Sequence, residues 1–197
     1  MADERTGIPV SGWSDRVNDP DVLAGLAKVR RAGCVFAVVV LILAFFAPVV
    51  AAMFSDKLKM DDAVKIGAAI AVAIALCSLI SKIAYAFKKP YEATVIAKKE
   101  SEKKQHDDKN DKSRHEYITI VRLPNGKTKK IVETLTLKHS AWKYLKVGDR
   151  FRYHPHLNYP YELYDKAAAG CLFCGVCSME NPVEADRCKK CGAPLIK

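Results

Sequence analysis

The sequence predicts a chain of three parts: a hairpin of two membrane-spanning helices, a small all-β domain, and a C-terminal module held together by cysteines. Three observations predict this fold class. Long apolar stretches dominate residues 32–88, β-branched residues alternate with polar ones from about residue 90, and two close pairs of cysteines lie near the C-terminus. Residues 1–31, which include several glycines and prolines, are expected to form a flexible N-terminal segment.

Residues 34–54 form the first predicted span. They are 21 consecutive residues without a charge, and a helix of about 20 apolar residues crosses the hydrocarbon core of a bilayer. Pro48 lies inside the stretch, which membrane helices tolerate. A cleaved signal peptide is the alternative, because Val50-Ala51-Ala52 resembles a cleavage site. The long preceding segment and the second span argue against it.

Residues 63–87 form the second predicted span, centred on the uncharged stretch 66–81. Gly67, Ala71 and Ala75 recur every four residues, so they lie on one helix face and allow another helix to approach closely. The first span is the expected neighbour, because only about ten residues connect the two spans. Association with a second copy of the chain is the alternative.

Basic residues predict which side of the membrane carries the termini. Three precede the first span and a dense group surrounds the end of the second: Lys28, Arg30, Arg31, Lys82, Lys88, Lys89, Lys98, Lys99, Lys103 and Lys104. Basic residues accumulate on the cytoplasmic side of membrane proteins. The sequence therefore predicts a two-span protein of the cell membrane with both termini in the cytoplasm, in contact with the lipid bilayer. The net charge of +10 fits this better than a nucleic-acid partner.

Residues 90–166 are predicted to form the β domain. Strands are expected at 91–99, 116–123 and 128–137, with two shorter ones at 150–154 and 159–165. Residues 100–114 lack large apolar side chains and are expected to form a mobile arm. Asn125-Gly126 favours a primed hairpin turn, and Ser140 can cap a short helix before the fourth strand.

The order of these elements resembles the small β-barrel domains found beside membrane spans in bacterial proteins. The phrases that carry the resemblance are Tyr91-Glu92-Ala93-Thr94-Val95, Leu123-Pro124-Asn125-Gly126-Lys127 and Lys146-Val147-Gly148-Asp149-Arg150. They are similar to membrane-anchored families of unknown function whose extramembrane part is OB-like. The resemblance implies an OB-like barrel and supplies no catalytic residues.

Two groups of side chains in this domain suggest binding. His154 and His156, with His139 or His115, could share a metal ion, because residues i and i+2 of a strand point to the same face. A surface pair without metal is favoured, since Pro155 disturbs the strand. The second group comprises four tyrosines: Tyr153, Tyr159, Tyr161 and Tyr164. They could stack nucleic-acid bases, although packing within the domain is favoured.

The C-terminal residues 170–197 contain two C-x2-C pairs separated by ten residues. Each pair forms a knuckle whose sulfurs lie on one side of a tight turn, and two knuckles supply four thiolates for a closed tetrahedral zinc site. The expected ligands are Cys174, Cys177, Cys188 and Cys191. Two disulfides are disfavoured, because the cytosol is reducing. A segment this short and polar depends on the metal for its folding.

This segment also resembles the short zinc-ribbon domains of bacterial membrane proteins. The similarity lies in Asn181-Pro182 of the connecting loop and in the closing residues Cys191-Gly192-Ala193-Pro194-Leu195. Structural Zn²⁺ is the expected cofactor, with iron in a rubredoxin-like site as the alternative. Cys171 is a spare ligand in the lead-in. Cys34 and Cys77 are expected to pack within the spans.

No catalytic motif is found, neither G-x-S-x-G nor H-E-x-x-H nor a phosphate-binding glycine loop. The sequence therefore predicts a non-enzymatic interaction or regulatory protein at the cytoplasmic membrane face, with an unknown protein partner. Two alternatives stay open. One is a membrane-tethered nucleic-acid binder with phosphate contacts at Arg187, Lys189, Lys190 and Lys197; the other is an electron-transfer protein with an iron four-cysteine site.

Overall fold

The computed structural model describes residues 11–54, 59–105, 112–134, 137 and 139–197. These residues form two compact units. One contains residues 11–26 and 89–197, and the other is Ala27–Lys88. The predicted combination of two apolar helices, a small antiparallel sheet and a cysteine cluster is confirmed.

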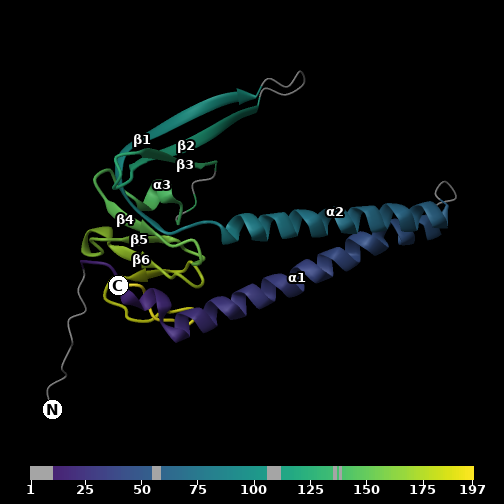
Figure 1. Cartoon of the computed structure of the whole chain (residues 1–197), viewed down its shortest axis with the longest axis horizontal. Helices are drawn as coiled ribbons and strands as arrows, with labels where there is room; N and C mark the ends of the chain where they lie inside the picture. Colours follow the sequence, from purple (N-terminus) through teal and green to yellow (C-terminus); the bar gives the residue numbers. More distant parts are fainter. Residues whose placement is uncertain (1–10, 55–58, 106–111, 135–136, 138) are drawn as a thin grey trace, which may run out of the picture. The chain divides into compact units, whose positions relative to one another are not determined.

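Two long helices account for the unit Ala27–Lys88 (Figure 1). Helix α1 is Pro20–Met53, so its first turns belong to the other unit, and helix α2 is Met60–Ala86. The most apolar 18-residue window is 0% buried in α1 and 11% buried in α2. A core helix of a soluble protein would bury most of such a window. Both helices are long and apolar enough to span a membrane.

The two helices approach each other closely at Gly67 of α2. A Cβ atom at Gly67 would lie 2.4 Å from the carbonyl oxygen of Phe45 in α1, so only glycine permits this contact. Ala63 and Gly67 are buried, whereas Ala75 is exposed. The expected contact between the spans is confirmed. It is made at Gly67, the first of the three small residues predicted to face the other helix.

We expect Gly67→Ala to destabilise the helix pair by about 1–3 kcal/mol, because the added methyl group forces the helices apart. Thermal unfolding in detergent measures the effect. Gly33→Ala is the matched control, since a Cβ at Gly33 has nothing within 4 Å. Equal unfolding temperatures for the two variants would contradict the prediction.

A five-stranded antiparallel sheet forms the β domain, in the order β3-β2-β1-β4-β5. The strands are β1 Tyr91–Gln105, β2 Lys112–Arg122, β3 Thr128–Glu133, β4 Arg150–Tyr153 and β5 Tyr161–Leu163. The short helix α3, Ala141–Tyr144, precedes β4, and the Ser140 side chain caps it as predicted. The sheet is open: an OB-like barrel would need β3 to pair with β5, and no such pair occurs among the described residues.

The first two strands continue further than their apolar content predicts. Residues 100–114 were expected to form a mobile arm, but β1 extends to Gln105 and β2 begins at Lys112. The ladder pairs Glu100 with Tyr117 and Glu102 with His115. Backbone hydrogen bonds of an antiparallel ladder do not depend on side-chain polarity, so the hairpin persists beyond its apolar base. Residues 106–111 lie outside the described residues.

The turn between β2 and β3 also differs from the prediction. The Gly126 N–H donates to the Leu123 carbonyl at 2.9 Å, and the Leu123 N–H donates to the Lys127 carbonyl at 2.8 Å. Gly126 has φ of 79°, while Asn125 is not among the residues with positive φ. The loop therefore has three residues and a glycine bulge, instead of the two-residue primed turn, which needs positive φ at its first position, Asn125.

Residues 11–26, called the N-terminal strap below, are structured, although flexibility was expected for residues 1–31. Ser11 forms an antiparallel bridge with Asp165. The Gly12 N–H donates to the Tyr164 carbonyl at 2.8 Å. The strap therefore lies beside the end of β5. Residues 1–10 lie outside the described residues.

The strap also completes the core of the cysteine-rich module. Val17, Val22 and Leu26 are buried in one cluster with residues of the C-terminal module, which includes Leu195 and Ile196. The 3-10 helix η2 (Ala167–Ala169) precedes the module, which contains the antiparallel strands β6 (Cys171–Phe173) and β7 (Glu180–Pro182). Its apolar core therefore includes side chains from both ends of the chain.

Candidate metal centre

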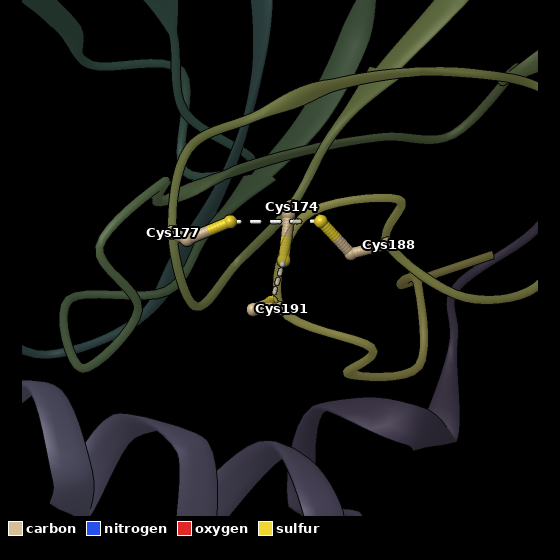
Figure 2. A group of neighbouring side chains, drawn as sticks. All are labelled: Cys174, Cys177, Cys188 and Cys191. Atoms are coloured by element: carbon tan, nitrogen blue, oxygen red, sulfur yellow. Dashed lines mark hydrogen bonds between the residues drawn. The ribbon is translucent and has the colours of Figure 1, made fainter.

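The four cysteines of the two C-x2-C pairs come together in the C-terminal module (Figure 2). The sulfur atoms of Cys174, Cys177, Cys188 and Cys191 all lie within 4.8 Å of one another. All four thiols are free, and the Cys174–Cys191 and Cys177–Cys188 sulfur pairs are 3.6 and 3.5 Å apart. Four sulfurs bound at about 2.3 Å around a tetrahedral ion would be about 3.8 Å apart. The cluster can therefore hold one metal ion.

The first pair lies in a tight turn that directs backbone amides toward sulfur. The Cys174 N–H donates to the Met179 carbonyl and the Ser178 N–H to the Cys174 carbonyl, both at 2.9 Å. Inside the turn the Val176 N–H donates to the Cys174 sulfur at 3.4 Å. Such amide donors stabilise a thiolate.

The second pair repeats this turn. The Cys188 N–H donates to the Ala193 carbonyl at 2.8 Å, and the Gly192 N–H donates to the Cys188 carbonyl at 2.9 Å. The Lys190 N–H donates to the Cys188 sulfur at 3.4 Å. The two knuckles are therefore equivalent hydrogen bond by hydrogen bond, as the spacing predicts.

The residue after each second cysteine has a left-handed backbone. Gly192 has φ of 72°, and Ser178, in the equivalent position, has φ of 56°. A left-handed conformation costs a residue with a Cβ roughly 1–2 kcal/mol. Only the second knuckle has glycine there, so the first knuckle carries a strain that the second avoids.

We expect Gly192→Ala to destabilise the module by about 1–2 kcal/mol through backbone strain alone, because a Cβ at Gly192 has nothing within 4 Å. Ser178→Gly removes the same strain and is expected to be neutral or slightly stabilising. Unfolding of the metal-loaded protein measures both. Destabilisation by Ser178→Gly as large as that by Gly192→Ala would show that φ is not the cause.

Burial and hydrogen bonding act in opposite directions on the thiols. Burial raises the pKa of Cys174, and it raises the pKa of Cys177 to about 11. Burial also acts to raise the pKa of Cys188, but hydrogen bonds from the Cys191 and Lys190 amides outweigh it and lower this pKa to about 6. Four thiolates in one place need a cation to offset their desolvation and mutual repulsion.

Asn181 connects the two knuckles and is 1% exposed. Its side-chain amide donates to the Met179 carbonyl at 2.7 Å and lies 3.7 Å from the Cys188 sulfur, while its oxygen accepts from the Lys189 N–H at 2.9 Å. Asn181 therefore fixes the position of a sulfur without being a ligand candidate itself. Its place in the connecting loop was visible in the sequence, but this contact was not.

We expect Asn181→Ala to weaken metal binding by roughly 10- to 100-fold, the usual effect of removing a group that orients a metal ligand. Competition with a chromophoric chelator measures the affinity. Glu180→Ala is the control, because Glu180 is exposed and adjacent in β7. Unchanged affinity in Asn181→Ala would contradict the role assigned to this amide.

Cys171 is not part of the cluster. It lies in β6 beside the aromatic core of the β domain, where its carbonyl accepts a hydrogen bond from Tyr144 at 3.5 Å. Cys34 and Cys77, expected to pack within the spans, are exposed on the helices. The structure thus brings together the four predicted ligand candidates and leaves the spare cysteine outside.

The other candidate residues are dispersed. Arg187 pairs with Asp21 at 3.2 Å and Lys197 pairs with Asp186 at 3.1 Å, so only Lys189 and Lys190 of the predicted phosphate contacts have no ion pair among the described residues. His115 lies beside Glu100, and His139 lies beside Phe173. The four tyrosines proposed for base stacking do not form one exposed surface, because Tyr159 is 3% exposed in the core whereas Tyr164 is 38% exposed.

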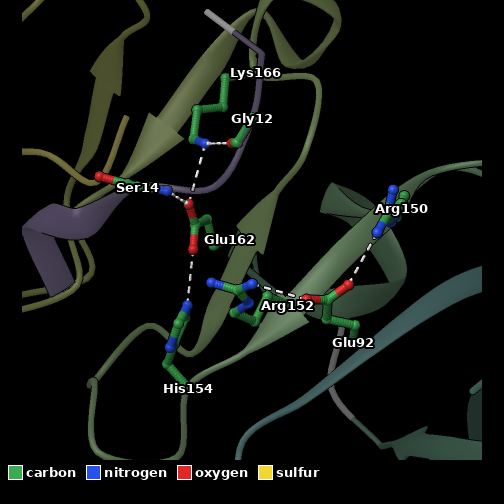
Figure 3. A network of polar contacts seen from close by, with 8 residues as sticks. All are labelled: Gly12, Ser14, Glu92, Arg150, Arg152, His154, Glu162 and Lys166. Carbon is green, nitrogen blue, oxygen red and sulfur yellow. Dashed lines mark hydrogen bonds and ion pairs between the residues drawn. The ribbon is translucent and has the colours of Figure 1, made fainter. Parts of the chain in front are cut away.

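A buried polar network, which sequence reasoning missed, lies where the strap meets β5 (Figure 3). Glu162 accepts hydrogen bonds from the Ser14 N–H at 2.6 Å and from Lys166 at 3.1 Å, and it contacts His154 Nε2 at 2.8 Å. Lys166 also donates to the Gly12 carbonyl. The side chains of His154, Glu162 and Lys166 are 7%, 2% and 1% exposed. His154 is therefore buried, which corrects the expectation of a surface pair.

Together these features define a class of protein: a chain with two apolar helices, a small open antiparallel sheet and a four-cysteine cluster able to hold a metal ion. No protein-family model, curated protein or solved structure is significantly similar to this chain. Its function is therefore inferred from the chemistry of its own residues.

Proposed function

We propose that the chain is a membrane-anchored, non-enzymatic interaction protein that presents a structural zinc ribbon and a β domain at the cytoplasmic membrane face. The observation that carries the proposal is the set of four thiols on two equivalent knuckles. Four protein ligands fill a tetrahedral zinc ion and leave no position for a substrate, as in structural zinc sites.

The membrane anchor is supported by the two helices whose apolar windows are almost wholly exposed. Lysines and arginines at the outer ends of the predicted spans favour cytoplasmic termini. In that reducing compartment the thiols stay available for metal. We infer zinc in preference to iron because a closed four-thiolate site is typical of structural zinc.

Metal content and location test the first part of the proposal. Protein purified from membranes should be colourless and contain one zinc per chain, while red protein with iron would assign the rubredoxin-like alternative. Protein recovered without detergent, in the soluble fraction, would contradict the anchor.

Partner capture tests the second part. Crosslinking in native membranes should recover a protein whose yield falls when Cys191 is replaced by serine and is unchanged in Cys171→Ser. A partner that survives loss of zinc would place recognition elsewhere. Nucleic acid is disfavoured as the partner, because Arg187 and Lys197 are already paired with carboxylates.

A further inference from the structure

A cleft of mixed polar and apolar lining lies beside the buried network, within the unit that contains the β domain. It has a volume of about 660 Å³, and its lining includes Asp15 of the strap, Tyr91 at the start of β1, and Arg152, His154 and His156 around the end of β4. Clefts of this size commonly bind ligands. Among the groups in its lining, His154 is buried and its Nε2 is held by Glu162 at 2.8 Å.

The contact with Glu162 fixes the tautomer of His154. Glu162 accepts the Ser14 N–H at 2.6 Å and pairs with the Lys166 ammonium group at 3.1 Å, and both contacts favour its ionised form. Glu162 is therefore a carboxylate, which only accepts hydrogen bonds, so His154 Nε2 carries the proton. In the neutral ring Nδ1 then has a free lone pair, and it has no hydrogen-bond partner among the described residues.

His156 places a second imidazole near the ring of His154. His154 and His156 lie in one turn, closed by the Leu157 N–H donating to the His154 carbonyl at 3.2 Å. Their ring centroids are 5.9 Å apart. Two imidazoles bound at about 2.0 Å to one ion have centroids roughly 5–6.4 Å apart, from tetrahedral to linear geometry. Pro155, which argued against ligation on a strand, instead supports the turn that brings the rings together.

We propose that this cleft is a second metal site, one that binds a first-row transition-metal ion through His154 and His156. A histidine whose other nitrogen donates to a carboxylate is the usual arrangement at metal sites, and imidazole suits Zn²⁺, Co²⁺, Ni²⁺ and Cu²⁺. Asp15 lines the same cleft. With two imidazole ligands and an open cleft, water completes the coordination, so the ion exchanges readily, unlike one held by four cysteines.

Cobalt binding to the zinc-loaded, full-length protein in detergent, without a histidine tag, tests the proposal. We expect one zinc and one cobalt per chain at equilibrium with free cobalt in equilibrium dialysis, with weak visible absorption from the bound cobalt. Intense thiolate-to-cobalt absorption would instead show exchange into the cysteine cluster and would count against a second site. A chain that binds no cobalt beyond its zinc at millimolar free cobalt would overturn the proposal.

Variants locate the cobalt. His156→Gln is expected to lose it and keep the zinc, whereas His115→Gln, which removes an exposed histidine elsewhere, is expected to keep both. His154→Gln should also lose cobalt, and thermal unfolding shows whether this buried substitution preserves the fold. Retention of cobalt by a folded His156→Gln protein would contradict the assignment.

Discussion

Replacing Cys174 or Cys188 with serine is expected to abolish metal binding and unfold the C-terminal module. Structural zinc sites contribute about 10–16 kcal/mol of apparent binding energy to the folding of small modules. The module has few apolar residues of its own, and its core depends on Val22 and Leu26 of the strap. Without metal, the four thiols lose the cation that holds the knuckles together. The module and the strap are therefore expected to unfold together.

Limited trypsin digestion in detergent measures this coupling. Cleavage should accelerate at least tenfold after Lys189 and Lys190 in the second knuckle, and also after Arg16 in the strap, which contacts the Leu195 carbonyl at 3.4 Å. Cys171→Ser is the matched control and should digest like the parent protein. Faster cleavage in the knuckle with unchanged cleavage at Arg16 would show that the strap folds independently of the metal.

The cysteine knuckles could be predicted because each depends on residues within six positions of one another. Spacing alone placed Cys174 and Cys188 at the start of equivalent turns, and the sequence also located the five strands and the Ser140 cap. These features follow from local backbone preferences and short-range hydrogen bonds. Features of this kind can be predicted from a single sequence, because the residues that form them are close together in the chain.

The strap could not be predicted, because its contacts are distant in the chain. Ser14 and Glu162 are 148 residues apart, and nothing in the glycine- and proline-containing segment around Gly12 indicates that partner. Lys166 gave no signal either, since lysine is almost never fully buried unless paired. Its burial is explained only by Glu162 and the Gly12 carbonyl, which the fold brings together.

Removing the charge of Glu162 is expected to cost about 3–5 kcal/mol, because it leaves Lys166 buried without its counter-ion. Glu162→Gln preserves the size of the side chain, so the loss reports charge and not a cavity. Glu92→Gln is the matched control: Glu92 also bridges two cations, Arg150 and Arg152, but its side chain is 28% exposed. Loss of such a partly exposed pair is expected to cost about 1 kcal/mol or less.

The same network predicts how stability changes with pH. The pKa of Glu162 is lowered in the folded state from its ordinary value of 4.5. The stabilisation is therefore complete above that value and is lost as pH falls through the folded-state pKa. Chemical unfolding between pH 7 and pH 3 should show a loss that is smaller in Glu162→Gln, while Glu162→Gln combined with Lys166→Met should recover much of the stability at pH 7. If the single and double variants are equally unstable, the buried charge of Lys166 is not what Glu162 compensates, and the cost must come from the hydrogen bonds to Ser14 and His154 that join the strap to the sheet.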